Sequence, residues 1–154
     1  MKETNRITKL FEDSYNGSPW IDVTIMDTLK NISAEQAVKK VTTERNSIWQ
    51  IVNHMIAWRE NVLLRIQGNE IVTPNNNYFT EIENTSETEW QKALERLENS
   101  QHQWIAFLKA FEESQFEKIY PKNRMSYYEH IHGILQHDAY HLGQIVLLSK
   151  LMAP

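Results

Sequence analysis

The sequence predicts an all-α protein built as a four-helix bundle, and three observations support this. Apolar residues recur at helical spacing over long stretches, helix-capping patterns precede several of these stretches, and no alternating strand pattern with a hairpin turn occurs. Most of the few glycines and prolines lie between the stretches. We therefore expect a short turn after Ser33 and helices over residues 3–15, 19–30, 46–67, 86–113 and 126–151.

The first two predicted helices, 3–15 and 19–30, are interpreted as one bundle helix that is broken at Gly17. Ser18 followed by Pro19 suits a helix start, because proline is favoured at the first helical position. The helix after Asn46 has one continuous apolar face, formed by Ile48, Ile51, Val52, Met55, Trp58, Val62 and Ile66.

The last two predicted helices begin at serines. Ser86 and Ser126 are each followed by a glutamate three residues later, which is the capping-box pattern. A polar segment of roughly residues 69–85, which contains Asn75, Asn76 and Asn77, precedes the first of these helices. The apolar face of helix 86–113 is Trp90, Leu94, Leu97, Trp104, Leu108 and Phe111.

The composition is that of one globular domain without a nucleic-acid partner. The chain has 154 residues, which fits a single domain over 1–154, since domains hold roughly 100–200 residues. Its net charge is −4 and its pI is about 5.9. A nucleic-acid-binding domain usually has a basic patch and a high pI, whereas the longest basic cluster here is Lys39-Lys40.

The residue types and segments that the sequence lacks exclude further classes of protein and kinds of site. The chain has no cysteine, so it has no disulfide, thiolate metal site or cysteine nucleophile. Its polar start over residues 1–6 leads into no apolar signal segment. Apolar runs such as 145–148 are far too short to cross a bilayer. We therefore expect a cytoplasmic protein with no membrane partner.

A pair of histidines provides the strongest chemical signal. His137 and His141 are four residues apart on a predicted helix, so they share one face, about 5–6 Å apart at Cβ. Two such imidazoles can converge on one metal ion, with bonds of about 2.0–2.1 Å to zinc. Both occupy positions that the apolar pattern assigns to the core, on the line Ile134, His137, His141, Ile145 and Leu148.

A third ligand must come from another helix, and His54 is the best candidate. It shares a line with Ile51 and Trp58, which places it at the edge of the apolar face of helix 46–67. Antiparallel neighbours in a bundle can bring it level with the pair. Three imidazoles leave coordination positions open, which is typical of a catalytic metal site rather than a structural one.

A structural interpretation competes with the metal site. A histidine on an apolar face is often a hydrogen-bonded core residue, and an HxxxH pair also arises by chance. His102, His130 and His132 are not expected to be ligands. Asp138 could orient the imidazole of His141 through its free ring N–H, or be a solvated or capping residue.

Other catalytic motifs are missing. The chain contains no GxSxG, no GxxxxGK[ST] and no GxGxxG pattern. Its many acidic residues lie mostly on polar faces, so no paired-carboxylate site is predicted. Tyr127, Tyr128 and Tyr140 could line a pocket, or serve in the core or an interface.

Three sequence blocks, spread over nearly the full length, carry a family likeness. They are residues 15–20 (YNGSPW), residues 47–54 (SIWQIVNH) with the following Trp58, Arg59 and Glu60, and residues 137–145 (HDAYHLGQI). The last block, HxxYHxGQI, is the most specific. On these blocks the chain resembles the DinB family of helical-bundle proteins, also called DinB-like or YfiT-like.

The resemblance implies an up-down-down-up bundle with a three-histidine metal site, and the matching positions are His54, His137 and His141. It does not imply DNA binding, because the family name comes from DNA-damage induction. Characterised members include S-transferases that use low-molecular-weight thiols and a thiol-dependent isomerase. Many others are described as metal-dependent hydrolases without a known substrate.

We therefore predict a divalent metal cofactor, zinc or nickel, and a small-molecule substrate. The preferred reaction is transfer of a bacillithiol-type thiol to an electrophile, and the alternative enzyme is a metal-dependent hydrolase. A non-enzymatic metal or ligand-binding stress protein, and a structural helical dimer with core histidines, are the other classes considered. Broad apolar faces and five tryptophans, together with the resemblance, also predict a homodimer packed through helices.

Overall fold

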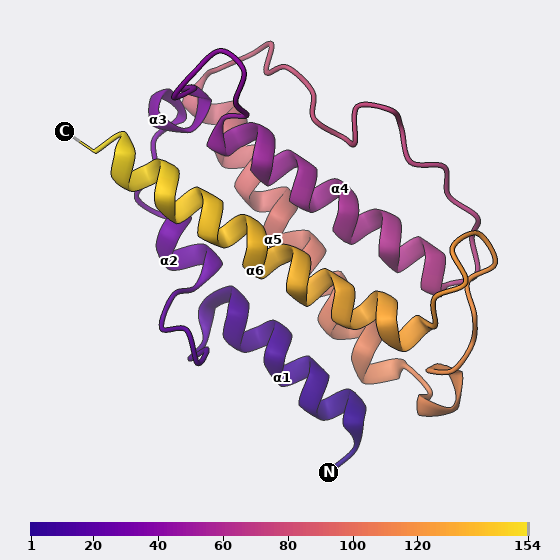
Figure 1. Cartoon of the computed structure of the whole chain (residues 1–154). Helices are drawn as coiled ribbons and strands as arrows, with labels where there is room; N and C mark the ends of the chain where they lie inside the picture. The colour runs from indigo at the N-terminus through magenta and orange to yellow at the C-terminus, as the bar shows by residue number, and fades with distance from the viewer. Residues whose placement is uncertain (154) are drawn as a thin grey trace.

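The computed structural model describes residues 1–153, and its regular structure is helical (Figure 1). Within these residues the only β pairing is an isolated bridge between Ile119 and Ser126. The all-α prediction is therefore confirmed, while the predicted domain range of 1–154 ends at a residue outside the described part. The helices are α1 (Glu3–Asn16), α2 (Ile25–Leu29), α3 (Ala34–Val38), α4 (Ile48–Ile66), α5 (Glu87–Ala110), a 3₁₀ turn η1 (Glu113–Gln115) and α6 (Tyr127–Leu151).

Serine caps start four of these helices, and the sequence pattern predicts the caps at Ser86 and Ser126. Ser33 and Ser126 form complete capping boxes, with Gln36 and Glu129 bonding back to the cap. Ser47 forms a further box at the start of α4. Ser86 accepts a hydrogen bond from the Glu89 amide, but its own amide donates to the Asn84 side chain, so the box there is half formed.

The helix predicted over 19–30 is wrong in its first half. The helix α2 begins only at Ile25, where the Thr24 side chain accepts from the Asp27 amide as the cap. Asp22 has a φ of 56°, which a right-handed helix cannot contain. The helix break predicted at Gly17 therefore extends through Thr24.

Two of the four long helices run in one direction along the bundle and the other two run in the opposite direction (Figure 1). The helices α1 and α5 are antiparallel, since Thr4 bonds Glu113, just beyond the end of α5, while the Phe11 carbonyl accepts from Gln101. The helices α4 and α6 are also antiparallel, since Arg59 pairs with Asp138 while His54 contacts His141. Figure 1 shows α4 and α5 running the same way, with α1 and α6 opposed to them.

A long connection makes the parallel course of α4 and α5 possible. Residues 67–86 contain no helix or strand and return along the side of α4 (Figure 1). Along this connection, successive residues contact earlier and earlier positions of α4. Thr73 bonds Arg65, Asn77 bonds Trp58, and the Thr80 carbonyl accepts from Gln50. The connection thus forms an outer wall beside α4 before α5 begins at the other end.

The core consists of two apolar clusters along the bundle. One lies towards the N-terminal end of α4 and contains Trp49, Met55, Trp90 and Ile145. The other lies towards the opposite end and contains Phe11, Trp104, Leu108 and Ile131. Burying these side chains supplies the main stabilisation, about 1.5–3 kcal/mol for each large apolar residue. None of the helices within residues 1–153 is long and apolar enough to cross a bilayer.

Candidate metal centre

The structure brings the three predicted ligands together from two helices. His54 comes from the middle of α4, and His137 and His141 come from successive turns of α6. One ring nitrogen from each can be chosen so that all three lie within 4.8 Å of one another. His54 and His141 are buried and His137 is half-buried, so the apolar pattern placed all three correctly at the inner side of their helices.

The separation of the ring nitrogens fits a shared ion. The Nε2 atoms of His54 and His137 are 3.0 Å apart. Two nitrogens that are each about 2.1 Å from one ion, at bond angles of about 90–110°, lie roughly 2.9–3.4 Å apart. The Nδ1 atom of His137 is buried without a hydrogen-bond partner, whereas its Nε2 faces the Nε2 of His54.

Neighbouring groups fix the tautomers of the other two histidines. The Nδ1–H of His54 donates to the backbone carbonyl of Asn77 at 2.6 Å, and that of His141 donates to Oε1 of Gln144 at 2.7 Å. Because these acceptors cannot donate, the Nε2 of each of these two histidines carries a lone pair that a metal ion could use. Hydrogen bonds of this kind orient metal-bound histidines and raise their basicity as ligands.

Burial also keeps these imidazoles neutral. Desolvation lowers the pKa of His54 to about 4, opposed by its hydrogen bond to Asn77. Desolvation, with smaller contributions from the other two histidines and Arg59, lowers the pKa of His137 to about 3. Desolvation also lowers the pKa of His141. A neutral imidazole is the form that binds a metal ion, and all three histidines are in this form at neutral pH.

Asn77 is a site residue that the sequence analysis missed. Its backbone carbonyl accepts from His54, and its side-chain Oδ1 accepts from Nε1 of Trp58 at 2.9 Å. The next residue but one, Phe79, stacks on the His54 ring with centroids 4.0 Å apart. Asn77 has a φ of 51°, a left-handed conformation that asparagine tolerates better than most residues. The run Asn75-Asn76-Asn77 was the only sequence signal for it.

Asp138 does not orient a ligand imidazole, and it is neither solvated nor a cap. Its carboxylate is 1% exposed and pairs with the fully buried Arg59, with Nη2 of Arg59 and Oδ2 of Asp138 2.8 Å apart. Arg59 also donates to Oε1 of Gln101 at 2.9 Å. The pair ties α4 to α6 one turn from the histidines, so it fixes the register at which His54 meets the other two.

The remaining histidines lie away from the cluster, as predicted. His102 is exposed on α5. His130 is buried, with Nδ1 donating to the Ser126 carbonyl and Nε2 accepting from Asn123. His132 packs against the Tyr128 ring, with centroids 4.3 Å apart.

A cavity of about 760 Å³ opens beside the cluster. All three histidines line it, together with Trp58, Asn77, Phe79 and Gln144. Of the three tyrosines considered as pocket residues, Tyr140 lines the cavity, whereas Tyr127 is buried in the second apolar cluster and Tyr128 packs at its edge. The volume is typical of a site for a small organic molecule.

Comparisons with known proteins agree with this architecture. Residues 24–145 match the model of the DinB superfamily. The chain belongs to the DinB superfamily. A solved structure, that of YfiT from Bacillus subtilis, superposes with a TM-score of 0.75 at 15% identity, covering 99% of this chain and 90% of that one. YfiT is described as a probable metal-dependent hydrolase with an unusual four-helix bundle topology. Among curated proteins, none matches the chain.

The superposition confirms the four-helix bundle fold. The match covers nearly the whole chain, whereas the family model leaves out α1 and the C-terminal part of α6. Within the matched range lie all three clustered histidines and the wall residue Asn77. The donor set, three neutral imidazoles, suits a divalent transition-metal ion.

Proposed function

We propose that this DinB superfamily member is a metal-dependent enzyme acting on a small molecule, with one divalent ion held by His54, His137 and His141. The observation that carries the proposal is the convergence of three neutral imidazoles beside a cavity of about 760 Å³. Zinc and nickel are the ions we expect there. A bound ion supplies Lewis acidity, which lowers the pKa of a neighbouring thiol or water.

Transfer of a low-molecular-weight thiol, of bacillithiol type, is the reaction we favour. Among residues 1–153, no aspartate or glutamate joins the histidine cluster, and Asp138 is committed to Arg59. A water nucleophile needs a positioned base for its proton, whereas a thiol is intrinsically far more nucleophilic and a few per cent ionised at neutral pH. The one carboxylate on the cavity wall, Glu44, is exposed and lies outside the histidine cluster, and for this reason we favour sulfur over water as the nucleophile.

The chain's own residues hold and shield the reacting groups. In the overall reaction a carbon–sulfur bond forms, the leaving group departs with its bonding electrons, and the thiol proton passes to solvent. Asn77 and Gln144 hold the His54 and His141 rings in one tautomer. Phe79 covers one face of His54, which keeps water from that side.

Hydrolysis of a small substrate is the second candidate, supported by the description of YfiT as a probable metal-dependent hydrolase. The two reactions need different nucleophiles in the same cavity. Measuring whether turnover depends on added thiol distinguishes thiol transfer from hydrolysis.

The test offers the protein a chlorodinitrobenzene electrophile with a low-molecular-weight thiol, and nitrophenyl esters without one. We expect the protein to conjugate the thiol to the electrophile. A chelator should abolish this activity, and returned metal should restore it. The His137→Ala variant should be inactive, whereas His102→Ala should remain active. Ester cleavage that ignores thiol would favour hydrolysis. Stoichiometric metal with no turnover of either kind would reject the enzyme and leave a binding protein.

We also propose that the protein is a homodimer, although fewer exposed tryptophans support this than the sequence alone suggests. Trp49, Trp90 and Trp104 are buried in the chain's own core, which removes most of the tryptophan surplus. Trp20 and Ile21, between α1 and α2, stay exposed and could pack against a second copy. Light scattering at micromolar concentration should give about twice the chain mass of 18.3 kDa, and a value near 18.3 kDa itself would reject the dimer.

A further inference from the structure

The cavity beside the histidines continues well beyond them along α6. His137 and Leu151 both line it, and fourteen residues of helix separate them, or roughly 21 Å at 1.5 Å per residue. A metal site with one small reactant needs only the part near the histidines. The remaining length is space for a second, larger portion of a ligand.

The α6 side of this distal part of the cavity is apolar and is formed by Leu147, Leu148 and Leu151. The segment before α4 also lines the cavity, with the apolar Val41, the polar Thr42 and Asn46, and the charged Glu44 and Arg45. Leu147 is 59% exposed and Leu151 is 62% exposed. Single exposed leucines are normal on protein surfaces, but several that line one cavity form a surface that a ligand can cover.

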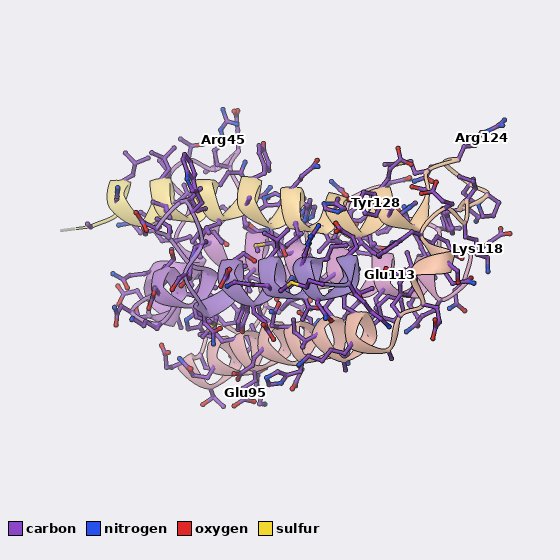
Figure 2. All side chains as sticks on the ribbon, turned by 90° about the horizontal axis from the view of Figure 1, so that it is seen from below. Arg45, Glu95, Glu113, Lys118, Arg124 and Tyr128 are labelled. Atoms are coloured by element: carbon purple, nitrogen blue, oxygen red, sulfur yellow. The ribbon has the colours of Figure 1, made fainter. Side chains whose placement is uncertain are left out.

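The charges on the cavity wall cancel. Glu44 and Arg45 are the only lining residues with charged side chains, and they are adjacent and exposed. Figure 2 shows Arg45 on the outside of the bundle beside the C-terminal half of α6. The basic residues Lys118 and Arg124 lie at the opposite end of the bundle (Figure 2). With one charge of each sign side by side, the wall has no net charge that would favour an anionic or a cationic ligand over an uncharged one.

We propose that the cavity binds an uncharged molecule with an apolar chain that lies along Leu147, Leu148 and Leu151, its polar head at the histidines. The assignment of this molecule as the electrophile of the reaction rests on the proposed function. The binding itself depends on the apolar wall and the balanced charge, and does not require the ion.

The test uses straight-chain alcohols as probes, because they are uncharged and share one head group. Butanol, hexanol and octanol are titrated into the purified full-length protein, and dissociation constants are read from amide NMR shifts. Each added methylene should tighten binding two- to fourfold, since a buried methylene contributes about 0.8 kcal/mol. Octanesulfonate and octylammonium should each bind at least tenfold more weakly than octanol.

Matched surface variants locate the binding. Leu147→Gln and Leu151→Gln, both at largely exposed positions, should reduce the gain per methylene. Leu10→Gln on α1, at a position 49% exposed, should leave it unchanged. Equal affinity for all chain lengths, tighter binding of either charged chain, or an equal effect of Leu10→Gln would overturn the proposal.

A chelator-treated sample separates this inference from the metal proposal. The gain per methylene should persist without metal, so it survives even if the histidines bind no ion. If alcohol affinity does not depend on chain length while the protein still binds metal, only the proposal of the apolar site is overturned. If wild type binds no alcohol and Leu147→Gln halves the mass in light scattering, the leucines form an interface between copies and the inference is wrong.

Discussion

Two buried polar clusters join α4 to α6, and they differ in how many helices they tie together and in whether they border the cavity. In the first, Arg59 pairs with Asp138 and donates to Gln101, whose own amide donates to the Phe11 carbonyl. This arginine cluster therefore links all four long helices through its own bonds. In the second, one ring nitrogen from each of His54, His137 and His141 lies within 4.8 Å of the others, and the Nε2 atoms of His54 and His137 are in hydrogen-bond contact at 3.0 Å.

The comparison separates two uses of buried polar residues. His137 and Asp138 are neighbours in sequence, but successive helical residues point about 100° apart, so one faces the cavity and the other faces the core. The arginine cluster lies in the core and sets the helix register. The histidine cluster borders the cavity, and we propose that a metal ion completes it.

Breaking the arginine cluster should have the largest effect. Asp138→Ala leaves the Arg59 charge buried without its partner, so the free energy of unfolding should fall by about 3–5 kcal/mol. The double variant Arg59→Met with Asp138→Leu removes both charges and should recover much of the loss. Urea unfolding measures all three proteins. A single variant as stable as wild type would show that the pair does not hold the bundle.

Moving the Asn77 carbonyl should weaken metal binding without breaking the fold. Asn77→Val disfavours the left-handed backbone, which displaces the acceptor of His54, so metal affinity should fall by about 10–100-fold. Asn77→Gly is the matched control, because glycine keeps this conformation at little cost and loses only the bond to Trp58. Competition with a chromophoric chelator measures both, and equal losses would reject the orienting role.

Acid should destabilise the metal-free protein through the histidine cluster. Burial lowers the pKa of His54 to about 4 and also lowers that of His141, while the unfolded chain keeps a value of about 6.5. The unfolded state therefore takes up protons first, so stability is full above about pH 6.5 and declines as the pH falls towards about 4. Urea unfolding of chelator-treated protein should show this slope, and His54→Gln should reduce it. A slope unchanged by His54→Gln would assign the acid sensitivity to other groups.

Helical periodicity was sufficient to predict the parts of the site that lie on helices. The line through His137 and His141 faces inward because four-residue spacing stacks side chains on one face, and His54 follows the same rule on α4. Asn77 could not be found this way, because its role depends on where an irregular connection passes α4. Asp138 was misjudged because its partner, Arg59, is 79 positions away in sequence.

The same limits explain the error in the fold. Ser18 and Pro19 form a serine–proline helix start in the sequence, whereas the φ of 56° at Asp22 and the cap at Thr24 show that the helix begins later. The long helices were predicted well because their apolar faces and caps agree with each other. Short elements such as α2, with five residues, have too few positions for periodicity to identify them.

The metal content of four variants tests the central claim most directly. Wild type and the four proteins His54→Ala, His137→Ala, His141→Ala and His102→Ala are purified alike, loaded with zinc or nickel, and analysed for bound metal after desalting. We expect about one ion per chain in wild type and His102→Ala, and a sharp loss in each of the other three, because two imidazoles alone bind far more weakly. Equal metal content in all five proteins would contradict the three-histidine site.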